Sequence, residues 1–176
     1  MDISNFGFIA ASTICFSVGF VAVKQFAFRR YAKMRSVCEP LIGPSSMSPR
    51  SVEVPIDATS AKKKFIAALT QVPIGTGWSM TNVDYNSPTL TATLRWSGKA
   101  AWAPSGQRAN APLLDSTLNL KADFNGMGSH CMLHWQYQYE GKEWGAPSHS
   151  FNDPMAERHC ITTNYHVLKA MDVGVL

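Results

Sequence analysis

All five histidines lie in the last 47 residues of this 176-residue chain, which raises the question of a metal site. Four of them fall in pairs on a predicted strand and a predicted helix: His130 with His134, and His159 with His166. Zinc could take two ligands from each element, or recruit Cys131 and Cys160. The His-x3-His spacing that binds zinc belongs on a helix, however, and here it spans a turn and a strand. With no Cys-x-x-Cys pair in the sequence, we expect satisfied or exposed histidines and no metal site.

The cysteines and carboxylates offer no better catalytic arrangement. Two Cys–His pairs are close in sequence: Cys131 with His134, and Cys160 with His159. Neighbours at this range on regular elements usually point to different faces, so the imidazole would miss the thiol. Glu140 and Glu143 flank a predicted turn and are expected to be solvated, and the glycine pairs match no phosphate loop. The sequence therefore predicts a protein that is not an enzyme and holds no cofactor.

A row of large side chains admits two interpretations. The row alternates along one predicted strand: Leu133, Trp135, Tyr137 and Tyr139. The favoured interpretation is the core face of a sheet, covered by helices. The alternative is a hydrophobic pocket between the sheet and the C-terminal helix, completed by Tyr165 and Leu168, in which tyrosine hydroxyls orient a ligand.

The net charge points to a membrane. The chain carries 16 Lys and Arg against 12 Asp and Glu, for a formal charge of +4. The whole excess lies in residues 1–36, because basic and acidic residues balance over residues 37–176. Just before the basic cluster Lys24–Arg35, the 21 residues Ile3–Val23 carry no formal charge. A helix of that length is about 31 Å long, which matches a hydrocarbon core of roughly 30 Å. The sequence thus predicts a single-pass anchor in membrane lipid and argues against nucleic acid as a partner.

The order of the charges also predicts the topology. Basic residues mark the side of the membrane that is not translocated, so the short N-terminus should lie outside and the remainder inside. A cleaved signal peptide would carry its positive charge before the apolar run. Three cysteines in the predicted soluble part, without framework spacing, favour a reducing or thiol-tolerant compartment such as the cytosol, matrix or stroma. Among these membranes we favour the mitochondrial inner membrane.

Small residues recur every four positions in the predicted span: Gly7, Ala11, Cys15 and Gly19. A stripe of this kind lets a second helix approach closely inside lipid. We therefore expect a helix–helix contact at this stripe with other integral membrane subunits.

After the anchor, residues 1–35, the composition predicts a linker and one domain. Residues 36–50 are rich in Pro, Ser and Gly, which break helices and strands. Residues 51–176 then show a strand, a helix, three or four antiparallel strands and a long C-terminal helix. The two helices are expected at about 61–72 and 154–172. The predicted fold class is α+β, in which a two-layer arrangement packs an antiparallel sheet with two helices.

Local signals refine this order. Pro55 indicates that the first strand lies at a sheet edge, and Asn125-Gly126 is a favourable tight-turn pair between two strands. The three residues Lys62–Lys64 are expected on the solvated side of the first helix, where they could touch anionic lipid.

Two predicted loops hold aromatic residues suited to docking. Residues 97–113 contain Trp102, and residues 141–152 contain Trp144 and Phe151. Long loops with aromatic side chains more often make contacts than merely connect elements. We expect these three residues to lie at an interface.

The strand and helix over Val52–Leu69, the antiparallel strands and the long C-terminal helix resemble a small version of the helix-grip fold of START-like lipid-binding proteins. The resemblance covers about two thirds of the chain in the order of its elements, and no family motif is matched residue by residue. It implies binding of a lipid or other hydrophobic ligand and assigns no ligand residues.

Two functions of different classes follow. The first is a non-catalytic, single-pass accessory or assembly subunit of a larger membrane complex, which docks through the small-residue stripe and the aromatic loops. A respiratory or photosynthetic complex fits this architecture. The alternative is a membrane-tethered domain that binds a lipid or other hydrophobic ligand. Neither function involves nucleic acid, and no small-molecule substrate is identified.

Overall fold

The computed structural model describes the C-terminal domain and a helix that precedes it. The described residues are 25, 29–41, 51–72, 77–80, 83–99, 113–143, 146–148 and 154–173. In this part of the chain, no helix combines the length and the apolar character needed to span a membrane. The predicted span Ile3–Val23 lies outside the described residues, so the anchor and its topology stay predictions.

The described chain contains a helix over residues 29–41, two further helices and six strands. In chain order the later elements are β1 (Val52–Val54), α2 (Ala58–Gln71), β2 (Ser79–Met80), β3 (Thr89–Lys99), β4 (Leu113–Met127), β5 (His130–Glu143), β6 (Ala146–Ser148) and α3 (Pro154–Ala170). All strand pairs are antiparallel in a sheet of order β1-β5-β4-β3-β2, and β6 pairs with β5 as well. The predicted α+β class with an antiparallel sheet is confirmed.

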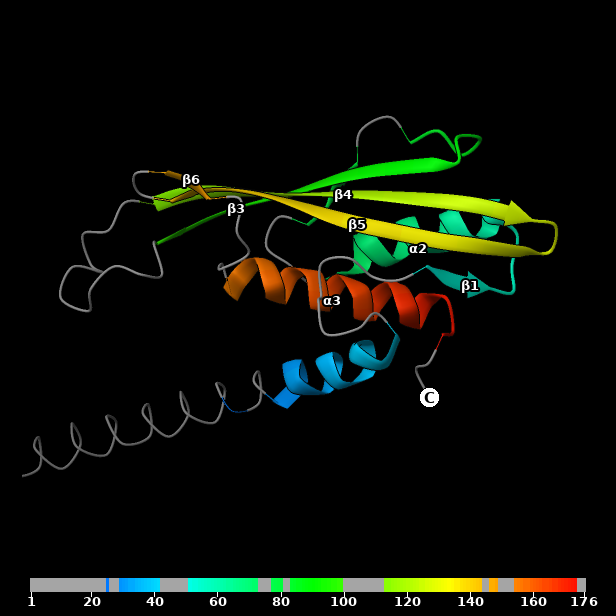
Figure 1. The fold of residues 1–176 in the computed structure, drawn as a ribbon, viewed down its shortest axis with the longest axis horizontal. Helices are drawn as coiled ribbons and strands as arrows, with labels where there is room; N and C mark the ends of the chain where they lie inside the picture. The colour runs from blue at the N-terminus through cyan, green and yellow to red at the C-terminus, as the bar shows by residue number, and fades with distance from the viewer. Residues whose placement is uncertain are drawn as a thin grey trace, which may run out of the picture.

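The helices are stacked on one side of the sheet. Figure 1 shows α2 and α3 against the sheet and helix 29–41 on the side of α3 that faces away from it. An antiparallel sheet commonly buries one face and leaves the other in water, which is the arrangement seen here. The helix over residues 29–41 thus adds a layer beyond the two that the sequence predicts.

The core forms between the apolar face of the sheet and the two helices α2 and α3. Buried side chains alternate along the three long strands: Leu90, Ala92, Leu94, Leu118, Leu120, Ala122, Phe124, Cys131, Leu133, Trp135 and Tyr137. Phe65 of α2 packs edge-on against Phe124 and Trp135, with ring centroids 5.5 and 5.9 Å apart. Full burial of one large apolar side chain contributes about 1.5–3 kcal/mol, so this contact fixes α2 on the sheet.

The start of α2 and the edge position of β1 agree with the sequence signals. Asp57 caps α2, and its carboxylate accepts the Ser60 backbone N–H at 2.9 Å. Hydrogen bonding to Ser60 lowers the pKa of this carboxyl, so the cap is ionised at neutral pH. β1 is the edge strand that Pro55 predicts.

The β4–β5 hairpin turns later than the Asn125-Gly126 pair predicts. Both residues stay in the ladder with β5. The turn contains Gly128 at φ 71°, in the left-handed region that favours glycine. Gly126 serves close packing instead, because a Cβ atom there would lie 3.3 Å from the Cβ atom of Ala58 on α2.

Strand pairing extends into both predicted loops. β3 and β4 remain paired as far as Lys99 and Leu113, inside the predicted loop 97–113. β5 and β6 pair within the predicted loop 141–152. Backbone hydrogen bonds continue a ladder through residues that lack apolar alternation, so the sequence pattern ends before the strands do.

The predicted linker begins as a helix, because residues 36–41 continue helix 29–41. Pro40 lies within the described part of this helix, which reaches residue 41. Cys38 is buried against the domain. This tertiary contact holds the segment helical, and local composition does not encode it.

Candidate functional site

Helix 29–41 joins the predicted anchor to the domain through a buried contact with α3. Met34 and Cys38 lie one turn apart and are both buried, with Cys38 only 1% exposed. The Cys38 thiol lies 4.0 Å from the carbonyl oxygen of Ile161 on α3, and burial raises its pKa to about 12. The thiol is therefore protonated, and it packs as a small apolar group rather than serving as a nucleophile.

Charged groups line the rim of this contact. Arg35 lies 3.0 Å from Glu39 on its own helix and 3.5 Å from Glu157 on α3. The guanidinium of Arg158 stands 5.7 Å from the ring centroid of Tyr31, whose pKa is raised by burial and by the charge of Glu157. Exposed ion pairs contribute roughly 0–1 kcal/mol each. Only the Arg35–Glu157 pair joins the two helices, so the buried side chains contribute most to holding them together.

Four of the six residues predicted to line a pocket lie deep between the sheet and the helices: Leu133, Trp135, Tyr137 and Leu168. Trp135 Nε1–H and the Tyr137 hydroxyl both donate to Asn164 Oδ1, at 2.8 and 2.7 Å. Burial raises the pKa of Tyr137, which keeps the hydroxyl protonated as a donor. These polar groups are thus occupied by a side chain of the protein itself. The sequence pattern did not indicate Asn164, because an asparagine on an apolar helix face carries no signal of its own.

The other two predicted pocket residues, Tyr139 and Tyr165, are partly buried at the margin of the core. Tyr139 stacks on Trp96 with ring centroids 6.0 Å apart, and its hydroxyl lies 3.3 Å from Ser116 Oγ. Trp96 in turn meets the imidazole of His159 edge-on at 4.7 Å. This aromatic cluster joins β3 and β5 to α3 and leaves His159 as a packing residue.

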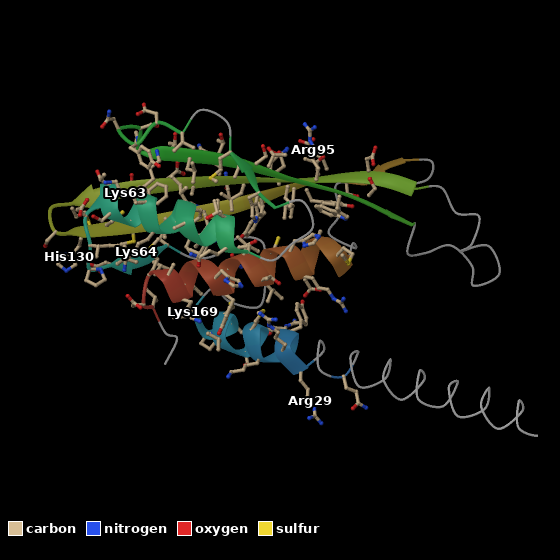
Figure 2. The ribbon with its side chains drawn as sticks, turned by 180° about the vertical axis from the view of Figure 1, so that it is seen from behind. Arg29, Lys63, Lys64, Arg95, His130 and Lys169 are labelled. Atoms are coloured by element: carbon tan, nitrogen blue, oxygen red, sulfur yellow. The ribbon has the colours of Figure 1, made fainter. Side chains whose placement is uncertain are left out.

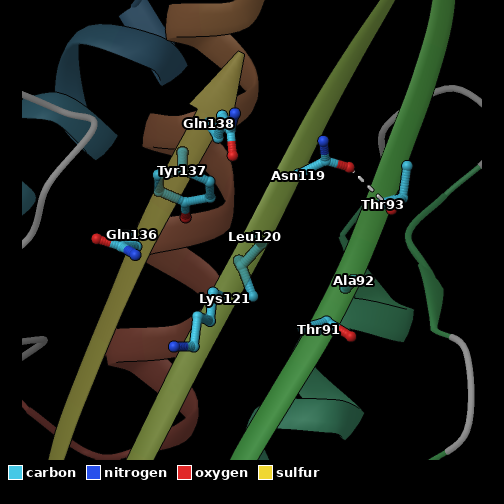
Figure 3. Close-up of a pocket in the computed structure, with 9 residues that line it drawn as sticks. All are labelled: Thr91, Ala92, Thr93, Asn119, Leu120, Lys121, Gln136, Tyr137 and Gln138. Carbon is cyan, nitrogen blue, oxygen red and sulfur yellow. Dashed lines mark hydrogen bonds between the residues drawn. The ribbon is translucent and has the colours of Figure 1, made fainter. Parts of the chain in front are cut away.

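A hollow of about 570 Å³ lies on the sheet, and Tyr137 is the predicted pocket residue among those that line it (Figure 3). Its polar lining comes from β3, β4 and β5: Thr91, Thr93, Asn119, Lys121, Gln136 and Gln138. Thr93 donates to Asn119 Oδ1 at 3.0 Å across two strands, as the dashed line in Figure 3 marks. The lining offers hydroxyl, amide and ammonium groups, and these side chains include no acid–base pair for catalysis. The sequence did not predict this hollow. Polar alternation indicates only that these side chains are exposed, whereas a hollow depends on the curvature of the sheet, which follows from its twist.

The prediction that Lys62 is solvated is wrong. Lys62 is 1% exposed, and its ammonium donates to the carbonyl oxygens of Asp84, Ser87 and Thr89 at 2.5, 2.7 and 2.7 Å. Burial lowers the pKa of Lys62, and the charge of Asp84 opposes that shift. Three carbonyl acceptors favour the charged form, so Lys62 ties the turn before β3 to α2.

The structure does not bring the strand histidines and the helix histidines into one metal site. His130 lies 3.0 Å from Ser129 Oγ, and His134 lies 3.5 Å from Ser51 Oγ, both at β5. Among the described residues, no group of three or more His, Cys, Asp or Glu side chains is placed to hold a metal ion.

His166 on α3 has unusual surroundings. Its Nε2 atom is buried and has no hydrogen-bond partner within the described part of the chain. Burial first, and then the positive charges of Arg30 and Lys169, lower the pKa of this imidazole. The imidazole is therefore neutral at neutral pH and marks a place where two helices bring cations together.

Seven predicted site residues lie outside the described residues, and their placement stays a prediction. They are the small-residue stripe, Gly7, Ala11, Cys15 and Gly19, and the three interface candidates, Trp102, Trp144 and Phe151.

Comparison with known proteins gives little additional information. No family model matches the chain, and no curated protein matches it. A DUF4468 family protein from Bacteroides ovatus ATCC 8483 shares 7% identity, with a TM-score of 0.31, over 53% of this chain and 54% of its own. The chain therefore spans about half the length of that protein. The Zhui aromatase/cyclase from Streptomyces sp. R1128 shares 9% identity, with a TM-score of 0.34, over 69% of this chain and 90% of its own. Scores of this size transfer neither an activity nor a ligand to this chain.

Proposed function

We propose that this protein is a non-catalytic, single-pass membrane protein and an accessory or assembly subunit of a larger membrane complex. Its α+β domain is held in a fixed orientation at the membrane, and a respiratory or photosynthetic complex of an organelle inner membrane fits this role. The observation that carries the proposal is the buried contact between helix 29–41 and α3, centred on Cys38 and Ile161.

This contact matters because of where helix 29–41 lies in the chain. Only residues 24–28 separate it from the uncharged stretch Ile3–Val23. A domain packed on such a helix by buried side chains cannot swing freely on a long tether. Fixed placement is what a docking subunit requires, since its surfaces must meet those of its neighbours in one geometry.

The alternative, a tethered carrier of a lipid or other hydrophobic ligand, meets an obstacle in the interior. A ligand between the sheet and α3 would have to displace the hydrogen bonds from Trp135 and Tyr137 to Asn164. Leaving a buried donor without a partner costs about 1–3 kcal/mol. This observation favours the subunit over the carrier.

Native purification distinguishes the two functions. The full chain is extracted from its membrane in a mild detergent, and its partners and bound lipids are identified by mass spectrometry. The proposal predicts stable co-migration with larger integral membrane proteins. Recovery as a monomer alone, with lipid inside the domain, would contradict it.

The predicted stripe in the membrane span gives a second test. Gly7→Leu combined with Ala11→Leu should abolish co-migration while membrane insertion is unchanged, because leucine prevents close helix approach. Phe8→Leu combined with Ser12→Leu is the matched control, since it places two leucines one residue away from the stripe. Equal loss of co-migration in both variants would show that the stripe is not the contact.

A further inference from the structure

The three helices carry a group of accessible basic side chains, which we call the basic helical face. Its members are Arg29, Arg30, Lys33, Lys63, Lys64 and Lys169. Figure 2 labels four of them and shows that they come from different elements, with Lys63 and Lys64 on α2, Lys169 on α3 and Arg29 on helix 29–41. The outer face of the sheet differs, because Arg95 and Lys121 are mixed there with acidic residues.

One ion pair and longer-range electrostatic interactions link these residues between the helices. Lys64 reaches 3.4 Å from the carboxylate of Asp172, just beyond the end of α3 and three residues after Lys169. Arg30 and Lys169 both lie close enough to His166 for their charges to act on its imidazole. The basic helical face therefore runs from α2, over the end of α3, to the beginning of helix 29–41. Asp172 is an acidic residue on this surface, and its side chain is 87% exposed.

We propose that the basic helical face lies against the anionic headgroups of the membrane in which the chain is anchored. This inference rests on the proposed membrane anchorage. Charge complementarity supports it, because a membrane surface rich in anionic lipid attracts basic side chains by about a fivefold gain in association for each one near the surface.

Position in the chain favours a membrane over another acidic partner. The face begins at Arg29, six residues after the predicted span ends at Val23. The span therefore keeps the face beside the headgroups at a high effective concentration, so a modest attraction for each residue is sufficient. A nucleic acid or a freely diffusing acidic protein has no such link to this chain.

Fluorescence quenching in nanodiscs tests the orientation with the full chain. A fluorophore is attached at one of two introduced cysteines. Ala67→Cys lies one turn from Lys63 on α2, and Gln138→Cys lies on the sheet's outer face. Both variants carry Cys15→Ser, so that Cys15 is not labelled. Quenching is by lipids with nitroxide headgroups, in nanodiscs of phosphatidylcholine alone or mixed with phosphatidylglycerol. The other three cysteines are buried and should not react.

The inference predicts strong quenching at Ala67→Cys in anionic nanodiscs, weak quenching in neutral ones, and weak quenching at Gln138→Cys in both. Lys63→Gln combined with Lys169→Gln should reduce the docked population relative to the undocked one by roughly tenfold or more. Arg95→Gln combined with Lys121→Gln removes as many charges from the sheet and should leave the quenching unchanged. Salt should weaken the quenching, since these charges are exposed to solvent.

The inference is overturned if quenching at Ala67→Cys does not depend on lipid charge, or if the Lys63 and Lys169 substitutions leave it unchanged. Either result leaves the anchorage intact. A chain that fails to enter nanodiscs at all would overturn the proposed function itself. The pKa of His166, followed by NMR, provides a second measurement. It should rise in anionic nanodiscs, because nearby phosphates compensate for Arg30 and Lys169, and an unchanged pKa would count against the inference.

Discussion

Two regions of the helical layer hold positive charge in opposite ways. Lys62 is buried, and three backbone carbonyl oxygens surround its ammonium. On the basic helical face, the charges of Arg30 and Lys169 both act on the imidazole of His166, whose Nε2 atom is buried. The first cation is satisfied within the chain, as a buried charge must be. The cations of the basic helical face are accessible to an external anion. Lys62 and Lys63 are adjacent in α2, so the first serves stability and the second serves surface recognition.

The largest expected effect separates Lys62 from its neighbour. Lys62→Met keeps the buried aliphatic stem and removes the charged donor from three carbonyl oxygens, so the free energy of unfolding should fall by about 2–4 kcal/mol. Lys63→Met is the matched control and should change it by no more than about 0.5 kcal/mol. Denaturant unfolding of the full chain in neutral micelles measures both values. Equal losses of unfolding free energy in the two variants would contradict the distinction between the buried Lys62 and the basic helical face.

A pH effect of intermediate size is expected at His166. The pKa of its imidazole in the folded chain lies below the ordinary value of 6.5, because of burial and the charges of Arg30 and Lys169. As the pH falls below 6.5, the unfolded chain therefore binds this proton before the folded chain does. The free energy of unfolding should fall from about pH 6.5 downward until the folded pKa is passed.

His166→Asn tests this expectation, because asparagine does not titrate. The difference in unfolding midpoint between about pH 7.5 and about pH 5.5 should be smaller in the variant than in the unmodified chain. His134→Asn is a suitable control, since His134 lies on β5 near Ser51. A pH dependence that His166→Asn leaves unaltered would mean that neither burial nor the nearby cations lower the pKa of this imidazole enough to affect stability.

The smallest expected effect isolates one of those cations. Lys169→Gln should raise the pKa of His166, because one of two positive charges near the imidazole is lost. Lys121→Gln, on the outer side of the sheet, should leave this pKa unchanged. NMR titration of the imidazole measures both variants in neutral micelles. A lower pKa after Lys169→Gln would contradict the described arrangement.

Periodic patterns in the sequence predicted most of the fold. Alternating apolar residues located β3, β4 and β5, and the capped apolar stripe located α2, because burial of one face determines both patterns. The ends of elements were predicted less well. The hairpin turn at Gly128 and the strand residues beyond the alternating segments depend on backbone pairing, which leaves no apolar signature.

The site was less predictable than the fold, because its features depend on long-range contacts. The burial of Lys62 follows from carbonyl groups 22–27 residues away, and that of Cys38 from a contact with a residue 123 positions later. A run of lysines and a Pro-rich segment indicate solvent exposure when taken alone. Only the folded chain shows that one lysine and one cysteine in them are buried.

Helix 29–41 is held on the domain by the buried contact at Cys38, and a pulsed electron paramagnetic resonance distance between the two tests this directly. Spin labels are placed at Ala32→Cys, on the exposed side of this helix, and at Gln138→Cys on β5, in the full Cys15→Ser chain in nanodiscs. We expect one narrow distance distribution, which Cys38→Asp broadens and the exposed substitution Ser36→Asp does not. A broad distribution in the chain that retains Cys38 would contradict the claim.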